Sequence, residues 1–249
     1  MRRDDPIDRI APTRRPPGMH IMKQRWEELL FLHWEVDVEM LRALIPSELE
    51  LDTFEGRAYV GLVPFTMSGV RPRFVPPFPP LSDFHETNVR TYVHYKGRDP
   101  GVWFFSLDAA QSIAVRIARA WFKLPYHYAT MHLERDVKNV VSYRSERHWP
   151  EPVPATVRAR YKVTGPIEPA KPGTLEHFLA ERYVLYAKDG SDLFLGRVNH
   201  VPYPLQKAEL FELDESLLRA AKIRRPEGPP PLVHYASGVD VDIWGLEKL

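Results

Sequence analysis

The sequence predicts an α+β fold built on one large, mostly antiparallel β-sheet with a few helices packed against it. Three observations lead to this fold class. Many stretches alternate in side-chain type with period two, which is typical of strands. Turn signals such as Glu55-Gly56 and Asp189-Gly190 separate neighbouring stretches, which favours hairpins. No repeat and no shift in composition marks a boundary, so we expect a single domain over residues 21–249.

The composition excludes several classes of protein. Lysine plus arginine number 34 and aspartate plus glutamate number 33, so the charge balance predicts neither a nucleic-acid partner nor an acidic membrane surface. The chain has no cysteine, which excludes disulfides, thiolate zinc sites and cysteine nucleophiles. No apolar stretch approaches the roughly 20 residues that span a bilayer, and the first residues lack the apolar core of a secretory signal. We therefore expect a cytoplasmic protein with no membrane partner, and a homo-oligomer stays open.

The first part of the chain is expected to be a leader followed by strands. Residues 1–20 are charged, carry four prolines and show no period, so we expect a flexible leader. Order is expected from about Trp26, through an apolar run over residues 29–36. Asp37 is placed to cap a short helix, which Pro46 ends. The expected ranges are a helix over 38–45, strands over 49–53 and 57–70, and a stiff, proline-rich loop over 72–80.

The stretch Phe84–Tyr95 is the most informative strand, because its two faces differ in chemistry. One face is β-branched or aromatic and suits packing: it carries Thr87, Val89, Thr91, Val93 and Tyr95. The other face offers a carboxylate, an amide, a guanidinium, a phenol and an imidazole, from Glu86, Asn88, Arg90, Tyr92 and His94. From the residues alone two interpretations are open. This face is the solvated side of a half-buried strand, or it lines a concave site.

A hairpin partner and an alanine-rich helix are expected after this strand. Residues 101–107 are almost wholly apolar, which predicts a strand that is covered on both faces. Asp108 and Gln111 have the spacing of a capping box for a helix over residues 109–122. One stripe of this helix is either an anion site or, more commonly, a solvated face. The stripe consists of Ser112, Arg116, Arg119 and Lys123.

The second half is expected to be mostly antiparallel sheet. Its expected strands span 131–136, 140–147, 155–163, 183–187, 193–201 and 239–244, with a short one near Leu210. Its expected helices span 174–182 and 215–223, and a proline-rich linker spans 226–231. The basic row of the strand over 155–163 has no aromatic residues between its charges, so we interpret it as facing water.

No motif in the sequence names a reaction. A phosphate-binding glycine loop, a Gly-x-Ser-x-Gly elbow and the histidine spacings of metal sites are absent. His85 and Glu86 are adjacent, so a strand points them to opposite faces and they cannot share a metal ion.

The remaining candidates for chemistry are Glu86 and Arg90 on the strand, and Tyr126 and His127 after the helix. Burial would raise the pKa of Glu86 and a nearby Arg90 would lower it, so the sign of the shift stays open. Each candidate also has a purely structural interpretation: a surface ion pair, a core tyrosine and a surface histidine.

Several of these stretches resemble the signatures of the YqjF-like proteins (domain of unknown function 2071). The resemblance covers about residues 22–244 and is carried by Trp26 and residues 31–34, 84–93, 101–109, 124–126, 181–186 and 200–205. This family is grouped with the acetoacetate decarboxylase-like fold. The resemblance therefore implies a curved, cone-like β-barrel with helices packed outside and an interior that could hold a small ligand.

The resemblance also implies where a site lies and which chemistry is missing. In acetoacetate decarboxylase a lysine forms a Schiff base with the keto acid, and the family places that lysine directly after a Phe-Pro that ends a helix. Here Tyr126 stands at the lysine position and His127 at that of its cationic neighbour. A tyrosine cannot form a Schiff base, so the fold carries over and the decarboxylase mechanism does not. Glu86 occupies about the place of the family's active-site glutamate, which favours an inward-facing polar row.

Together, the residues and the resemblance predict a protein that binds or transforms a small oxygenated metabolite, a keto or carboxylic acid, without a Schiff-base lysine. The catalytic candidates are Glu86 as the acid or base, Tyr126 as a donor to a carbonyl, and His127. The substrate-binding candidates are Asn88, Arg90 and Arg119, with Arg90 holding a carboxylate.

No cofactor and no metal ion is expected at this site. Whether the protein is an enzyme stays open at this point. If it is one, we expect acid/base chemistry of the lyase or hydrolase kind. The alternatives are a non-catalytic small-molecule-binding protein and a structural barrel filled by its own side chains.

Overall fold

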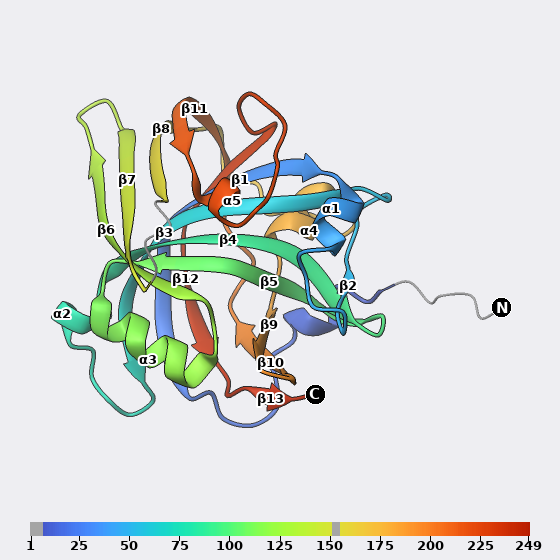
Figure 1. Cartoon of the computed structure of the whole chain (residues 1–249). Helices are drawn as coiled ribbons and strands as arrows, with labels where there is room; N and C mark the ends of the chain where they lie inside the picture. The colour runs from blue at the N-terminus through green and yellow to red at the C-terminus, as the bar shows by residue number, and fades with distance from the viewer. Residues whose placement is uncertain (1–6, 151–154) are drawn as a thin grey trace.

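The computed structural model describes residues 7–150 and 155–249, and its described part is dominated by one sheet of 13 strands (Figure 1). The strands are β1 (Met22–Val36), β2 (Glu50–Leu51), β3 (Ala58–Pro72), β4 (Phe84–Tyr95), β5 (Arg98–Ala109), β6 (Tyr126–Arg135), β7 (Val140–Trp149), β8 (Thr156–Thr164), β9 (Val184–Asp189), β10 (Asp192–Asn199), β11 (Leu205–Glu215), β12 (Leu232–Ile243) and β13 (Glu247–Lys248). The helical segments are η1 (Ala11–Thr13), α1 (Val38–Arg42), α2 (Pro79–Ser82), α3 (Ser112–Phe122), α4 (Leu175–Ala180) and α5 (Leu217–Ala220).

Followed from each strand to its hydrogen-bonded neighbour, the pairings lead back to the starting strand along two closed paths. We call these paths circuits. One circuit runs through β5, β9, β10, β12, β1, β3 and β4. The other leaves β5 through β6, β7, β8 and β11 and rejoins the first at β12. Strands β12, β1, β3, β4 and β5 belong to both circuits. Most pairings are antiparallel, whereas β5 pairs in parallel with β6 and β9. The result is a curved sheet whose shared strands have protein on both sides.

Side chains alternate between two cores along the shared strands, as the period of a strand requires. On β1, Leu30 and Leu32 pack in a core with Tyr143 and Tyr161, which come from β7 and β8. Phe31, which lies between them, points to the opposite side of β1. It packs in a second core, which is enclosed by the circuit that contains β9 and β10. Residues 29–34 of β1 and 58–65 of β3 are buried on both faces, which explains the long apolar runs at these positions.

Strand β4 follows the same rule with polar side chains. Its bounds agree with the predicted stretch, and both of its faces are buried. Val89 lies in the first core, and the Thr87 hydroxyl lies 2.6 Å from the Tyr143 hydroxyl. Glu86 and Asn88 are buried on the opposite face. The polar row of this strand is therefore not a solvated face.

The start of helix α3 corrects the sequence interpretation. We predicted a helix from residue 109 with Asp108 as its cap, but α3 begins at Ser112 and the Gln111 side chain accepts a hydrogen bond from the Ile113 amide. Asp108 belongs to β5 and is fully buried. Its carboxylate accepts hydrogen bonds from Nε and Nη2 of Arg147 on β7 at 2.7–3.1 Å. A buried carboxylate requires a counter-charge, so Asp108 pairs with Arg147 and does not cap the helix.

Several other predicted bounds also differ from the structure. The stiff loop over 72–80 contains the start of α2, where prolines occupy the first helical positions and need no amide hydrogen. Strand β12 begins at Leu232, well before the predicted residue 239, because it pairs with β1 along nearly its whole length. Strand β11 likewise extends far beyond the short strand expected near Leu210.

Residues 7–20, in the predicted leader, contact the sheet. Arg15 forms an ion pair with Asp242 at 2.7 Å and lies 5.0 Å from the centre of the Trp244 ring. Arg9 forms an ion pair with the buried Asp52. The remaining residues of the predicted leader, 1–6, lie outside the described part of the chain. Within the described residues, no helix is long and apolar enough to cross a membrane.

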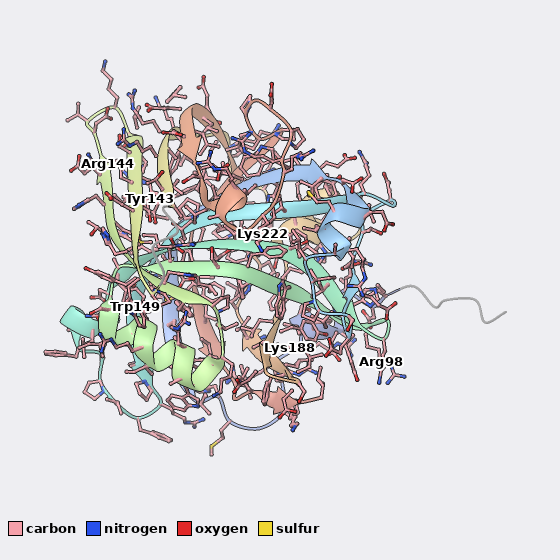
Figure 2. The ribbon with its side chains drawn as sticks, viewed as in Figure 1. Arg98, Tyr143, Arg144, Trp149, Lys188 and Lys222 are labelled. Atoms are coloured by element: carbon pink, nitrogen blue, oxygen red, sulfur yellow. The ribbon has the colours of Figure 1, made fainter. Side chains whose placement is uncertain are left out.

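The Asp108–Arg147 pair gives a test of how β5 is held to β7. We expect Arg147→Met to lower the free energy of unfolding by about 3–5 kcal/mol, because it leaves the Asp108 carboxylate buried and without a counter-charge. Urea denaturation at neutral pH measures this loss. Arg144→Met is the matched control, since Arg144 lies on the exposed side of the same strand next to the buried Tyr143 (Figure 2). It should change stability by no more than about 0.5 kcal/mol. Equal losses in the two variants would contradict the role of the pair.

Candidate functional site

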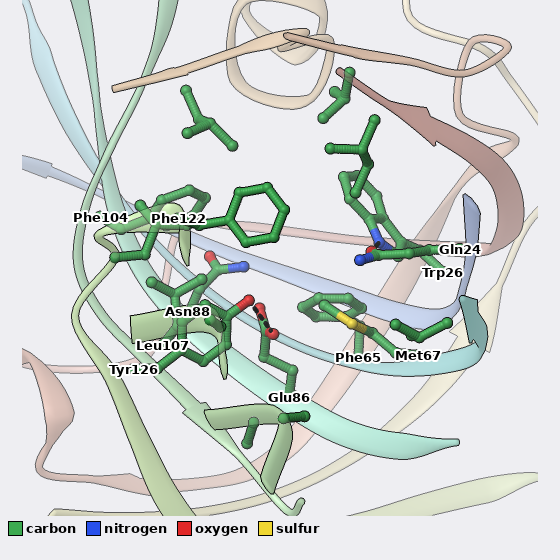
Figure 3. A pocket seen from close by; sticks show the side chains of 18 of the residues that line it. Gln24, Trp26, Phe65, Met67, Glu86, Asn88, Phe104, Leu107, Phe122 and Tyr126 are labelled. Atoms are coloured by element: carbon green, nitrogen blue, oxygen red, sulfur yellow. Dashed lines mark hydrogen bonds between the residues drawn. The ribbon is translucent and has the colours of Figure 1, made fainter. Parts of the chain in front are cut away.

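A cavity of about 360 Å³ lies on the polar side of β4 (Figure 3). Its walls come from β1, β3, β4, β5, β9, β10 and β12, from the first residue of β6, and from helices α2 and α3. The lining is mostly apolar and aromatic, with a few polar groups among them, which is the usual make-up of a small-molecule site. Besides the indoles of Trp26 and Trp121, the side chains of the lining that carry polar groups are Gln24, Glu86, Asn88, Arg90, Tyr126, Arg182 and Tyr203.

Strand β4 supplies three of these polar groups because alternate residues point to one side. Glu86, Asn88 and Arg90 all line the cavity and are buried. Glu86, with 1% of its surface exposed, is the most buried of the three. Figure 3 shows Glu86, Asn88 and Tyr126 pointing to the same part of the cavity. The structure thus brings together four of the six predicted site residues.

Glu86 and Tyr126 form the central pair of the site. The Tyr126 hydroxyl donates a hydrogen bond to Oε2 of Glu86 over 2.9 Å. Burial raises the pKa of Glu86 from an ordinary 4.5 to about 8, although the hydrogen bonds from Tyr126 and Asn88 act in the opposite direction. Burial, together with the neighbouring Glu86, also raises the pKa of Tyr126 well above 10. Both groups therefore hold their protons at neutral pH, and Glu86 titrates in the range that suits a general acid or base.

Arg90 is the cation of the cavity wall. Its Nη2 donates to the Leu179 carbonyl over 3.0 Å, and its guanidinium lies 5.6 Å from the centre of the Phe31 ring. Its Nε has no hydrogen-bond partner. Among the described residues no carboxylate forms an ion pair with Arg90, whereas Arg182 pairs with Asp52 over 2.7 Å. A buried guanidinium without a counter-ion is suited to bind an anion from outside the chain.

Two predicted site residues, Arg119 and His127, do not line the cavity. Since His127 follows Tyr126 on a strand, it points to the other face, where its Nδ1 lies 3.8 Å from Asp108. Burial lowers its pKa to about 4. Arg119 lies on the side of α3 away from the cavity, and its Nη1 donates to the Tyr126 carbonyl over 2.7 Å. These two residues are therefore no part of the proposed site, although Arg119 helps to position Tyr126.

Sequence reasoning missed the apolar face of α3, which forms one wall of the cavity. Ile113, Ile117 and Trp121 line the cavity and are still about half-exposed. Their spacing of about four residues is the signal that marks one face of a helix. The sequence analysis considered only the cationic stripe on the opposite face. Arg182 was also missed, because it follows α4 in a segment with no strand period.

The cavity offers neither an amine nor a metal site within the described chain. No lysine lines it, and Lys123, the nearest candidate in sequence, forms an ion pair with Asp189 over 3.0 Å. In the described ranges, His, Asp and Glu side chains nowhere gather in a group of three or more that could hold a metal ion.

Comparison with known proteins places this site in a family. The profile of DUF2071, described as an "uncharacterized conserved protein", matches residues 23–240. The chain belongs to this family. The uncharacterized protein YqjF of Bacillus subtilis (strain 168) is 42% identical over 233 residues, which make up 94% of each chain. The family predicted from the sequence is thereby confirmed.

Solved structures place the DUF2071 chain in the acetoacetate decarboxylase-like fold. The enduracididine biosynthesis enzyme MppR, complexed with pyruvate, superposes with a TM-score of 0.62 and 13% identity over 93% of this chain and 91% of its own. Acetoacetate decarboxylase from Legionella pneumophila gives a TM-score of 0.62 and 13% identity over 96% and 92%. An acetoacetate decarboxylase-like enzyme from Sphingomonas wittichii gives 0.60 and 14% over 93% and 94%. At this identity the likeness confirms the predicted fold and nothing further.

The raised pKa of Glu86 predicts how stability depends on pH. The folded protein keeps Glu86 protonated to about pH 8, whereas the unfolded chain ionises it near its ordinary pKa of 4.5. Between these values the unfolded state holds fewer protons, so the contribution of Glu86 to the free energy of unfolding falls as pH rises. We expect the native protein to lose up to about 1.4 kcal/mol per pH unit relative to Glu86→Gln.

Urea denaturation of both proteins at several pH values from about 4.5 to 8.5 measures this difference. Glu86→Gln is the natural control, because its amide has nearly the shape of the protonated acid and does not titrate. Parallel stability curves for the two proteins would mean that Glu86 ionises normally in the folded state.

Proposed function

We propose that the protein is an enzyme that catalyses an acid/base step on a keto or carboxylic acid, without forming a Schiff base. One observation carries this proposal: a buried Glu86, hydrogen-bonded to Tyr126, lines the same cavity as Arg90, a cation that forms no ion pair within the described chain. A proton-exchanging group and an anion-binding group in one apolar cavity are what such a step requires.

The proposed roles follow from the chemistry of each group. Arg90 binds the carboxylate of the substrate through its unused donors. Glu86 exchanges a proton with the carbon next to a carbonyl group, and its titration near pH 8 leaves both forms accessible. As that proton leaves, negative charge moves onto the carbonyl oxygen. Tyr126 and the Asn88 amide are the donors that would stabilise it.

Structural neighbours support the class of substrate. One is a biosynthetic enzyme complexed with pyruvate, and another is an acetoacetate decarboxylase. The chemistry proposed for this chain differs from a Schiff-base mechanism because no lysine lines the described cavity. Binding without turnover is the second candidate function, since the same cavity and the same Arg90 would serve a non-catalytic binding protein. A cytoplasmic location stays a prediction.

Exchange of hydrogen for deuterium tests the acid/base step directly. The protein is incubated in D₂O with straight-chain keto acids that carry the carbonyl at different distances from the carboxylate, and proton NMR follows the loss of the signal from the carbon next to the carbonyl. We expect exchange that is faster than in buffer and saturates with substrate. Glu86→Gln should slow it by about 10²–10⁴-fold, the usual contribution of a general acid or base. Its dissociation constant for the keto acid should change only a few-fold.

Three outcomes decide between the candidates. Saturable binding without exchange would favour the non-catalytic binding protein. Unchanged exchange in Glu86→Gln would remove Glu86 from the mechanism. A stable adduct after borohydride treatment, detected as a mass increase of the protein, would restore a Schiff base and contradict the proposed chemistry. Glu146→Gln on the exposed side of β7 is the matched control, since it makes the same change outside the cavity.

A further inference from the structure

We infer that the natural ligand is an amphiphilic carboxylate, with its charged group at Arg90 and an apolar chain that runs past Glu86 to a mouth beside α3. This inference rests on the proposed function, because it assumes that the ligand is a carboxylic acid. It goes further by assigning a chain length and a direction to that acid.

The side chains of β4 that line the cavity become less polar from Arg90 to Phe84. Arg90 lies at the inner end of the lining stretch and Phe84 at its outer end, where it is only partly buried. The neighbouring strand β3 places Phe65 opposite Glu86 and Met67 opposite Phe84. Outward of Glu86, β3 and β4 thus line the cavity with apolar side chains and β1 adds the amide of Gln24, whereas inward of Glu86 β4 carries Asn88 and Arg90.

The mouth of the cavity is lined by apolar side chains that are still partly exposed to solvent. Ile113, Ile117 and Trp121 of α3 line the cavity, yet 50%, 51% and 54% of their surfaces remain exposed. Leu81 of α2 lines it too and is 39% exposed. An apolar ligand chain that leaves the cavity beside these side chains would cover their exposed apolar surface. Removing that surface from water is favourable. The charged side chains of α3 lie on its other face, so α3 presents only apolar groups to an emerging chain.

The volume of the cavity indicates how large a ligand it can hold. At roughly 30 Å³ for each water molecule, the volume of 360 Å³ holds about a dozen water molecules. A three-carbon keto acid has only six non-hydrogen atoms and would leave about half of this space to be filled by water against apolar walls. A carboxylate with a chain of about eight to ten carbons fills it.

The distance between the polar groups agrees with an elongated ligand. Arg90 and Glu86 lie four positions apart on the strand, which separates their Cα atoms by roughly 13 Å. The Arg90 guanidinium packs near Phe31 and Tyr92, whereas the Glu86 carboxyl contacts Tyr126. A ligand that contacts both groups is therefore longer than a three-carbon acid.

Binding of saturated, straight-chain carboxylates of four, six, eight and ten carbons tests the inference. Isothermal titration calorimetry on the full chain measures each dissociation constant. We expect affinity to rise by about fourfold for each methylene, the value for burial of a CH₂ group, until the cavity is full. Arg90→Gln should weaken the whole series by about tenfold or more, because every member loses the same charged contact.

Ala118→Leu tests the direction of the chain. Ala118 lines the cavity from α3, so a larger side chain narrows the outer part, and the longest acids should lose the most affinity. Ala120→Leu is the matched control, since Ala120 is exposed and does not line the cavity; its binding profile should match that of the native protein. If Arg90→Gln does not fold, Arg90→Lys replaces it, with a smaller uniform loss expected.

The outcomes separate this inference from the proposed function. Affinity that is flat or falls with chain length, with keto-acid exchange intact, overturns the amphiphile and leaves the acid/base function standing. An Ala118→Leu profile equal to that of Ala120→Leu overturns the direction of the chain. If no carboxylate binds and no exchange occurs, both the inference and the proposed function are wrong.

Discussion

Strand β4 lies between two sets of strands, and its residues 86–94 are buried on both faces. A strand with alternating side chains then has only two ways to place a polar row, against polar partners or in a cavity. Thr87 takes the first way, through the Tyr143 hydroxyl. Glu86 and Arg90 take the second way and line the space on the other side. The curvature of the sheet and the chemistry of the site are thus consequences of one arrangement, in which five strands are shared by both circuits.

Two buried acids, Asp108 and Glu86, differ in the side chains that contact their carboxyl groups. Asp108 and Glu86 lie on neighbouring strands, where Thr87 pairs with Asp108 and Glu86 with Ala109. Burial raises the pKa of both acids, but Asp108 has a full counter-charge in Arg147, which opposes the rise and favours its ionised form. Glu86 has only neutral donors, the Tyr126 hydroxyl and the Asn88 amide, so its pKa rises to about 8. The different partners of two similar acids give Asp108 an ion pair and leave Glu86 as the candidate for proton exchange in the proposed function.

Patterns of neighbouring residues predicted individual strands of this fold, but not the contacts between strands that are distant in the sequence. The period of β4 and the turn signals predicted the strand and its two chemical faces, because both depend on neighbouring residues alone. The sign of the pKa shift of Glu86 could not be predicted, because it depends on which distant side chains bury the carboxyl and on Arg90 pointing away from it. Asp108 was misread as a helix cap for the same reason, since its partner Arg147 is 39 residues away. Contacts between distant strands decided each of these points.

The position of Arg90 constrains the kind of reaction that the proposed site favours. A decarboxylation requires the carboxylate to lose its charge as carbon dioxide leaves, so a cation that binds the carboxylate stabilises the starting state. Here the only cavity cation without a counter-ion in the described chain lies inward of Glu86, while the proton-exchanging pair lies further out. In the proposed complex the carboxylate is held at one place and the proton moves at another. We therefore favour a reaction that retains the carboxylate and acts on a carbon further along the chain.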